Sequence, residues 1–596
     1  MYTDTTQLAI DYPHLAAAFA HLPQGEAHLQ RLQDLNTSWQ RMLTTTRQYA
    51  EVVVSEERPA VAATATFDII YAGGGLNLLN AAIMTLRYGY RVLVFDRFTV
   101  GAVHREWNIS REELQELITV GLLTSEELET VVQRKYREGL VRFHSAHIHV
   151  RTTELWVQDV LDIAVDAEKL MSVCIKKILE HQPAGGLPNV ILHGTTFERC
   201  AVQPGRGVVV DVCDSSGLYA SYGARLLIDG MGSTSPIACQ LNCGRPFSLV
   251  CPTVGTVARG YKQGNKPGEV DPEVGEVLVT TEDVRAGHQL IWEAFPGRDD
   301  QVAIYLFYYA EAGQHVDLLQ LFDDFFALLP SYKDTRNVEI LKPVYGFIPA
   351  GYAVSVPWQR VEKVLAYDHV LSLGDSAAFQ SPLTFCGFGS YVRNIRRITK
   401  VMQQALQDGC LKASDLSRIH AAEAVPAVAR IFSKFMIAQP GQASWQINET
   451  LNVFCRVLQA SGAPIAQAFF KDRVTWLDYT RIVLRTPRYY PNIFRLALTT
   501  LTFNEMMGWL FAWLQLGRQS AMYRLYRLLN PLVRGLMALL RRPGPHLALR
   551  LLGWSEAMEQ VGRSIIGQKK RSDGRVPGIV PQDGPAFWLG GHWPQG

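Results

Sequence analysis

The hydrophobic pattern is clearest near the start of the chain, where it predicts a strand, a glycine turn, a helix and a second strand. Residues 67–71 form a short apolar run, typical of a buried parallel strand. Three glycines at 73–75 follow, and a mostly apolar stretch without proline from 76 to 88 predicts a helix. A second apolar run, 91–95, ends at Asp96. This order is typical of the βαβ unit that binds dinucleotides.

Each part of this unit has a role in holding a pyrophosphate and a ribose. Gly73 and Gly75 let the backbone approach a ligand closely, and the helix from Leu76 offers N–H groups and partial positive charge. Asp96, 23 residues after Gly73, is placed to accept a hydrogen bond from a ribose hydroxyl. The third glycine of the usual pattern is replaced by Leu78, which favours altered helix packing rather than lost phosphate binding. A purely structural turn is the alternative.

Two later stretches repeat the passage from an apolar strand into glycines. The predicted strand 224–228 runs into a D-G-x-G-S turn that contains Gly232, and the strand 370–373 runs into Gly374 and Asp375. A cofactor longer than one nucleotide needs a second contact of this kind, so the pair of turns favours FAD over NAD. Asp375 is placed to bond a ribityl hydroxyl. A further predicted helix begins with Gly387, Phe388 and Gly389. Its N-terminus is expected to face the carbonyl edge of the flavin.

The remaining pattern divides the chain into regions of different character. Residues 1–60 and 400–596 are mainly helical, 155–179 predicts one long helix, and 243–351 favours strands. The predicted fold is therefore α/β, with a Rossmann-like FAD-binding domain, an antiparallel β domain for substrate and a helical C-terminal region. We place an N-terminal helical extension at 1–64, the FAD-binding domain at 65–242 and 365–400, the substrate sheet at 243–364 and the helical region at 401–596.

Charge changes the interpretation of the C-terminal region. The net charge of the 596 residues is only +2, but residues 481–571 hold 15 Lys and Arg against three acids. Seven of the twelve tryptophans lie after residue 400. A basic, Trp-rich, apolar region predicts contact with an anionic membrane surface and no nucleic acid, the alternative being a solvated face without a partner. Polar residues interrupt the apolar stretch 496–517, so it favours a buried or interfacial helix over a spanning one. Pro531 is expected to break the last long helix.

No metal site is predicted. The nine cysteines have scattered spacings, typical of a reducing compartment without a disulfide framework. His147 and His149 share one face of a predicted strand, but no third ligand accompanies them.

Two carboxyl groups are candidate general acids, Glu311 first and Glu106 as the fallback. Glu311 ends an aromatic strand, where desolvation would raise its pKa, although an ordinary strand-end glutamate in water is the alternative. Glu106 lies in the segment Arg105-Glu-Trp-Asn108, which is rich in side chains that could face a flavin ring. The alternative for that segment is a capped helix start, with Ser110 and Glu113 as the capping box.

Four stretches together resemble one enzyme family: AGGGLNLLNAA, VLVFDRF, HREWNISREEL and GDSAAFQSPLTFCGFGS. They are similar to the CruA/CruP type of FAD-dependent lycopene cyclase, over roughly residues 65 to 400. The likeness implies a flavin-monooxygenase-like fold and a reaction, the cyclisation of the ψ-ends of lycopene to β-rings, giving γ- and then β-carotene. Reduced FAD is the active form in that family, and NADPH supplies the electrons.

The resemblance also implies site residues and a location. Arg97 and Arg105 join the FAD contacts, and Glu311 stands near the place of the family's F-L-E-E-T glutamates, of which this chain has one. Tyr308, Tyr309 and Phe385 offer aromatic faces to a carbocation. The expected location is the cytoplasmic face of a thylakoid membrane, with a carotenoid substrate and room for a bound pigment such as chlorophyll. The alternatives are a polyprenyl reductase or hydroxylase on the same scaffold, or a pigment-binding protein without catalysis.

Overall fold

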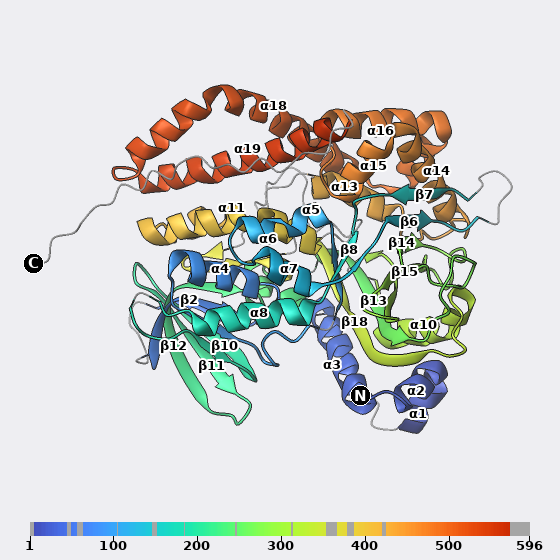
Figure 1. Cartoon of the computed structure of the whole chain (residues 1–596), viewed down its shortest axis with the longest axis horizontal. Coiled ribbons are helices and arrows are strands. Elements are labelled where there is room, and N and C mark those ends of the chain that lie inside the picture. The colour runs from blue at the N-terminus through green and yellow to red at the C-terminus, as the bar shows by residue number, and fades with distance from the viewer. Residues whose placement is uncertain are drawn as a thin grey trace, which may run out of the picture.

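The computed structural model describes residues 5–44, 49–56, 63–103, 105–145, 152–183, 185–244, 247–311, 314–352, 366–377, 387–419 and 425–572. It has two large sheets side by side, with N-terminal helices below and C-terminal helices above in the view of Figure 1. The predicted α/β class, with a Rossmann-like domain, a largely antiparallel sheet and a helical C-terminal region, is confirmed.

The first sheet has nine strands, and its core is parallel. Its order is β1 (Val53–Ser55), β10 (Thr195–Gln203), β11 (Gly207–Asp214), β12 (Tyr219–Asp229), β2 (Ala65–Ala72), β3 (Val92–Phe95) and β9 (Val190–Leu192), with β19 (Ala366–Tyr367) and β20 (Val370–Ser372) beside β12. The predicted βαβ unit is β2, α4 (Leu78–Tyr88) and β3. β12 pairs in parallel with both β2 and β20, so the strands that precede the predicted glycine turns are direct neighbours. The carboxyl ends of neighbouring parallel strands meet at one edge, which is where such sheets bind ligands.

The second sheet has eight strands, in the order β17 (Ala310–Glu311), β13 (Phe247–Arg259), β16 (Val302–Phe307), β15 (Ile291–Pro296), β14 (Val274–Val279), β6 (Glu138–Arg142) and β7 (Glu154–Val157), with β18 (Glu339–Tyr352) on β13. Side chains of successive residues point to opposite faces. One face packs on α10 (Leu318–Tyr332), α2 (Pro13–Ala20) and α3 (Gly25–Thr44), and the other packs on C-terminal helices. A third sheet is small, with β4 (Trp107–Ile109), β8 (Ile163–Val165) and β5 (Val132–Lys135).

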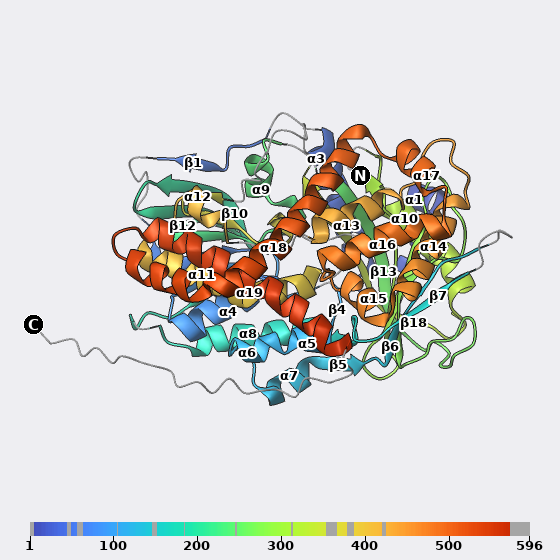
Figure 2. The ribbon, with the colours of Figure 1, turned by 90° about the horizontal axis from the view of Figure 1, so that it is seen from above.

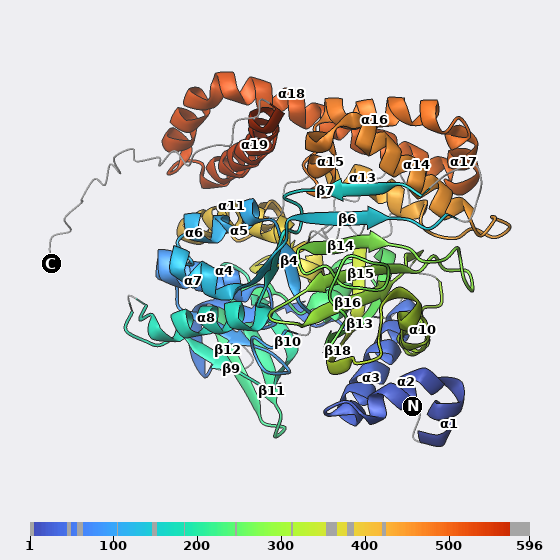
Figure 3. The same cartoon turned by 45° about the vertical axis from the view of Figure 1, so that its right-hand side comes forward.

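The C-terminal region covers both sheets, as Figures 2 and 3 show. α11 (Gly387–Asp408) packs on α4 and lies under the long hairpin of α18 (Phe503–Leu540) and α19 (Pro545–Ser572). The second sheet is covered by helices between them: α13 (Val425–Lys434), α14 (Gln446–Ser461), α15 (Ala463–Phe470), α16 (Trp476–Tyr489) and α17 (Ile493–Thr500). Other helices are α1 (Thr5–Asp11), α5 (Arg111–Leu114), α6 (Glu116–Thr119), α7 (Ser125–Val131), α9 (Pro236–Leu241) and α12 (Ala413–Leu416).

Two predictions of secondary structure are wrong. The segment 155–179 is not one helix, because it contains β7, β8 and then α8 (Ala167–Glu180). In β7 buried and exposed residues alternate, the period of a strand, and the strand pairs with β6. Strands β6 and β7 thus belong to the second sheet although they precede residue 242. Pro531 does not break the last long helix, since α18 continues through it.

Candidate functional site

Three chain bends meet at the carboxyl edge of the parallel strands. The Gly73 N–H donates to the Phe95 carbonyl of β3 at 2.8 Å. The Gly230 N–H donates to the Ala72 carbonyl of β2 at 2.7 Å, and the Leu373 N–H donates to the Asp229 carbonyl of β12 at 3.0 Å. Each bend is therefore held by the strand beside it, and the predicted turns at 73–75, 230–232 and 373–375 form one surface.

The first bend has the form that a phosphate cradle requires. Gly73 has a φ of +106°, and a Cβ there would lie 2.3 Å from the Gly230 carbonyl oxygen, so only glycine fits. A Cβ on Gly75 would meet no atom within 4 Å, so this glycine borders open space. Within the described part of the chain, the N–H groups of Gly75, Leu76 and Asn77 have no protein acceptor. These three donors at the start of an 11-residue helix suit an anionic group.

Leu78, which replaces the third glycine, is fully buried in the core between α4 and its neighbours. Its side chain is thus part of the packing of α4 and does not obstruct the bend. Asp96 is half-buried, and its carboxylate accepts hydrogen bonds from the N–H groups of Gly74 and Phe98, both at 2.8 Å. Arg97 is exposed, with its guanidinium 4.8 Å from the centre of the Phe98 ring.

A buried polar cluster fixes the second bend, and the sequence did not identify it. Asp229 is completely buried, and it accepts hydrogen bonds from the Ser235 hydroxyl at 2.7 Å and from the Ser372 hydroxyl at 3.0 Å. Burial raises the pKa of the Asp229 carboxyl to about 6, although these hydrogen bonds oppose the rise. The nearby Gly232 has a φ of +77°, and a Cβ added there would meet no atom within 4 Å.

Asn77 connects the first bend to the third. Its side-chain nitrogen donates to the Leu373 carbonyl at 3.3 Å, and its oxygen accepts from the Tyr391 hydroxyl of α11 at 2.6 Å. Gly374 follows at φ +75°, and then comes Asp375, which has solvent-accessible surface at the bend. Partial desolvation raises the pKa of the Asp375 carboxyl, and the charge of Arg105 opposes the rise.

Arg105 lies between the bends and the second sheet. A Cβ on Gly346 of β18 would stand 2.6 Å from its guanidinium, so the strand leaves room for the arginine by having a glycine. Burial lowers the pKa of Arg105, while Asp375, Tyr305 and Glu293 are close enough to raise it. The arginine thus links the third bend to the face of the sheet that carries Tyr305.

Glu293 of β15 is a buried acid that the sequence pattern did not mark as a candidate. The residue is 8% exposed, and one carboxyl oxygen has no hydrogen-bond partner among the described residues. Burial raises its pKa to about 8, although Arg105 opposes the rise. A single charged residue in the apolar run 291–296 was the available signal.

The two predicted acids have lysine partners instead. Glu311 forms an ion pair with Lys434, which also contacts Glu505 at 2.7 Å, and the Glu311 side chain is 45% exposed. Glu106 pairs with Lys342 at 2.8 Å and lies beside a cavity of about 10 Å³. Each of the two predicted acids is therefore held in an ion pair with a lysine from a distant part of the chain.

The predicted aromatic residues of the site do not all lie on one face of the second sheet. Tyr309 lies on the face that holds Glu293, whereas Tyr308 points to the opposite face and stacks on His288 at 4.0 Å. Phe385, His147 and His149 lie outside the described residues. So does the stretch 378–386 of the second glycine motif.

The first turn of α11 meets the segment 105–113. Phe388 packs on Trp107 with ring centroids 4.6 Å apart, and a Cβ on Gly389 would lie 3.0 Å from the Glu113 carboxylate. Gly387 begins the helix. Two of the stretches that carry the family resemblance are therefore in contact, although some 280 residues separate them.

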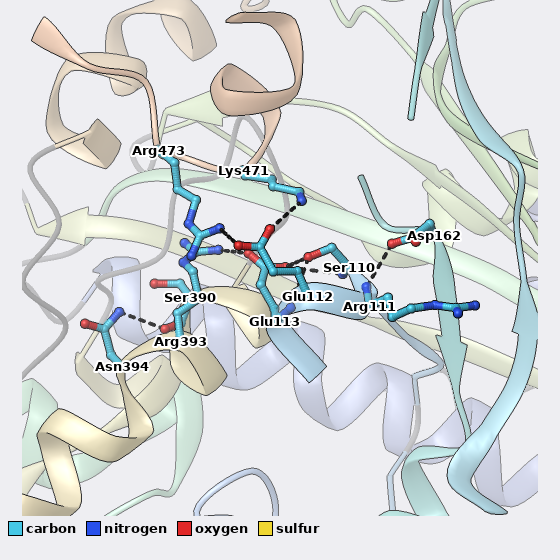
Figure 4. A network of polar contacts seen from close by, with 10 residues as sticks. All are labelled: Ser110, Arg111, Glu112, Glu113, Asp162, Ser390, Arg393, Asn394, Lys471 and Arg473. Carbon is cyan, nitrogen blue, oxygen red and sulfur yellow. Dashed lines mark hydrogen bonds and ion pairs between the residues drawn. The ribbon is translucent and has the colours of Figure 1, made fainter. Parts of the chain in front are cut away.

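Glu113 is the centre of the polar network in Figure 4. It completes the predicted capping box with Ser110 and forms a fully buried ion pair with Arg393 of α11. Burial opposes its charge, but Arg393, Lys471 and Arg473 together outweigh that effect and lower the pKa of Glu113 to about 2. The network joins the capped helix start to α11 and to the segment after α15.

A second cluster lies away from the bends. Among the described residues, Cys410, Asp415 and His546 could bring one ligand atom each to a metal ion. The Asp415 carboxylate already accepts from His546 at 2.7 Å and faces Arg550 at 4.0 Å. These contacts give the cluster a structural role, in which it holds α19 against α12.

Comparison with known proteins gives resemblance of fold only. Neither a family model nor a curated protein sequence matches the chain. Among solved structures, a geranylgeranyl bacteriochlorophyll reductase-like protein from Thermoplasma acidophilum is 11% identical, with a TM-score of 0.48 over 73% of this chain and 100% of that chain. The halogenase PltM with FAD is 12% identical, with a TM-score of 0.48 over 85% and 96%. A p-nitrophenol 4-monooxygenase from Pseudomonas putida is 13% identical, with a TM-score of 0.46 over 70% and 99%. At these values the function has to be argued from the site itself.

Proposed function

We propose that the chain binds FAD along the three bends and cyclises the ψ-ends of lycopene to β-rings, giving γ- and then β-carotene. The observation that carries the proposal is the meeting of the bends at Gly73, Gly230 and Gly374 at one sheet edge. The donors at Gly75 to Asn77 suit the pyrophosphate, Asp96 a ribose, and Asp375 the ribityl chain. The resemblance to CruA/CruP cyclases supplies the substrate.

The side chains beside the bends suit a reaction through a carbocation. Tyr305, Phe307 and Tyr309 lie on the face of the second sheet that Arg105 approaches, and all three are buried. Such a face excludes water from a cation, and its aromatic rings attract the positive charge. Reduced FAD, with NADPH as the source of electrons, would supply an electron-rich, negatively charged ring when bound. The reaction itself is an isomerisation, with no net change of oxidation state.

The C-terminal hairpin fits an anionic membrane surface as the partner. Along α18 an apolar stripe is open to solvent, with Leu528 78%, Leu532 71% and Leu539 75% exposed. Arg527 and Arg534 lie on a flank of the helix, about 100–120° from this stripe, and the exposed Arg524 lies one turn before Leu528. A stripe of this kind favours a helix that lies in the lipid interface, attracted by anionic headgroups. No helix of the described residues is long and apolar enough to cross a bilayer.

The test has two independent readouts. Protein purified with excess FAD and then desalted should keep flavin absorption bands, and expression in a lycopene-accumulating bacterium should yield γ- and β-carotene. A product with added hydrogen or oxygen would point to a reductase or hydroxylase. Carotenoid or chlorophyll bands without flavin would point to a pigment carrier. Either result overturns the proposal.

A further inference from the structure

The position of Glu293 in its sheet is unusual for a charged residue. It lies between Ile291 and Phe295 on the same face of β15, and it is opposite Tyr305 of β16 in the strand register. That face is the apolar core shared with the C-terminal helices, which includes Phe307 and Tyr309. A carboxyl on such a face is rarely retained unless it is paired or used.

The surroundings of Glu293 hold it in its neutral form. One carboxyl oxygen is buried without a hydrogen-bond partner among the described residues, so the ionised group would be poorly solvated. Arg105 is the cation whose charge acts on the Glu293 carboxyl, and it also interacts with Asp375 of the third bend. The titratable groups that interact with Glu293 are Arg105, Cys251, Tyr305, Tyr309 and Tyr332. The raised pKa of Glu293 agrees with this geometry.

We infer that Glu293, and neither Glu311 nor Glu106, is the general acid that starts ring closure, with Arg105 as its positioning residue. This inference rests on the proposed function. Glu311 and Glu106 are each neutralised by a lysine, and the Glu311 side chain is 45% exposed. Glu293 is buried on the apolar face, close to the arginine that also interacts with Asp375 of the third bend.

The proton and electron balance of the step closes without a further reactant. The Glu293 carboxyl gives its proton to the terminal double bond of the polyene, which leaves a tertiary carbocation. The electron pair of the neighbouring double bond attacks this cation and forms the carbon–carbon bond of the ring. A proton then leaves an adjacent ring carbon, its electron pair becomes the ring double bond, and the proton restores the Glu293 carboxyl.

The experiment compares Glu293→Gln and Glu293→Asp with the full-length holoenzyme, assayed with FAD, NADPH and lycopene in D₂O. The wild type should place one deuterium on each ring. Glu293→Gln should keep FAD but lose at least about 100-fold in cyclisation rate, the lower bound for removal of a general acid. Glu293→Asp should recover part of that loss. Glu311→Gln and Glu106→Gln are the matched controls and should cyclise at rates near the wild type.

The pH dependence of the cyclisation rate distinguishes a catalytic role of Glu293 from a purely structural one. Wild-type activity should fall as pH rises through about 8, because the acid form of Glu293 is lost. Arg105→Gln removes the charge that favours the carboxylate, so its basic limb should move to higher pH. If Glu293→Gln fails to fold, the shift of the basic limb in Arg105→Gln is by itself the test of the inference. Full activity of Glu293→Gln, or a limb that Arg105→Gln leaves in place, overturns the inference. A wild type that makes no cyclic product overturns the proposed function instead.

Discussion

The hydroxyl of Tyr391 donates a 2.6 Å hydrogen bond to the side chain of Asn77, and both residues are buried. Through this bond and the Asn77 contact with the Leu373 carbonyl, the start of α4, the end of β20 and α11 hold one another in place. The 314 residues between Asn77 and Tyr391 are thereby bridged at the place where the glycine bends meet.

This bridge can be tested directly. Asn77→Ala should lower the free energy of unfolding by about 1–3 kcal/mol, because it leaves the Tyr391 hydroxyl buried without its acceptor. FAD affinity should fall with it, since the bends lose their mutual support. Tyr391→Phe is the matched variant and should cost less, because it removes one partner and leaves the Asn77 bond to Leu373 intact. Urea unfolding and FAD titration measure the two effects, and unchanged FAD affinity in Asn77→Ala would contradict the role.

A substitution at Gly75 can distinguish an effect on cofactor binding from an effect on folding. A Cβ there meets no protein atom, so Gly75→Ala should change the free energy of unfolding of the apoprotein by no more than about 0.5 kcal/mol. If a pyrophosphate lies against this backbone, the same methyl group should weaken FAD binding by at least about tenfold, or 1.4 kcal/mol. Gly535→Ala, in α18 with equally open space, is the control and should leave FAD affinity unchanged. Equal FAD affinity in both variants would place the pyrophosphate elsewhere.

Glu293 should make stability depend on pH. Its pKa is raised in the folded state from 4.5 to about 8, so the folded protein binds the extra proton between these values and stability falls as pH rises. Glu293→Gln removes this dependence. Its stability relative to the wild type should therefore increase between pH 4.5 and 8, by on the order of a few kcal/mol. Thermal unfolding of the apoprotein across that range is the measurement. A difference that does not change with pH would show that Glu293 is ionised.

The buried pair of Glu113 and Arg393 should have the opposite pH dependence. The pKa of Glu113 is lowered in the folded state to about 2. Its contribution to the free energy of unfolding is therefore complete above pH 4.5 and disappears as pH falls towards 2. Glu113→Gln leaves Arg393 buried with its charge uncompensated, which should cost about 3–5 kcal/mol at neutral pH. Glu129→Gln, in an exposed ion pair with Lys135, is the control and should cost less than about 1 kcal/mol. Unfolding curves at pH 7 and pH 3 distinguish the two.

The membrane proposal predicts a specific loss of binding. Replacing Leu528, Leu532 and Leu539 by serine should reduce flotation with vesicles that contain anionic lipid, because the stripe loses its apolar area. The matched control replaces Leu179, Leu187 and Leu218, which are 52%, 57% and 68% exposed on the nucleotide side. It should float like the wild type. Equal loss in both triple variants, or loss in neither, would contradict an interface at α18.

The sequence alone determined what depends on local patterns. The apolar runs, the glycines at 73–75 and the cap at Ser110 predicted β2, α4, β3 and α5 correctly, because periodicity and turn chemistry act over a few residues. The second glycine turn at Gly374 was found in the same way. These features were enough for the α/β class and for the edge of the sheet where the bends lie.

Tertiary structure alone decided which carboxyl is buried. Glu311 lies at the end of an aromatic strand, but Lys434, 123 residues later, folds against it and neutralises its charge. Glu293 lies in an apolar run that predicts only a strand, and its burial comes from the helices that cover that face. Burial and charge partners set the pKa of a carboxyl, and both are supplied by residues far away in the chain. The burial of Glu293 was therefore fixed only when the two sheets and the C-terminal helices came together.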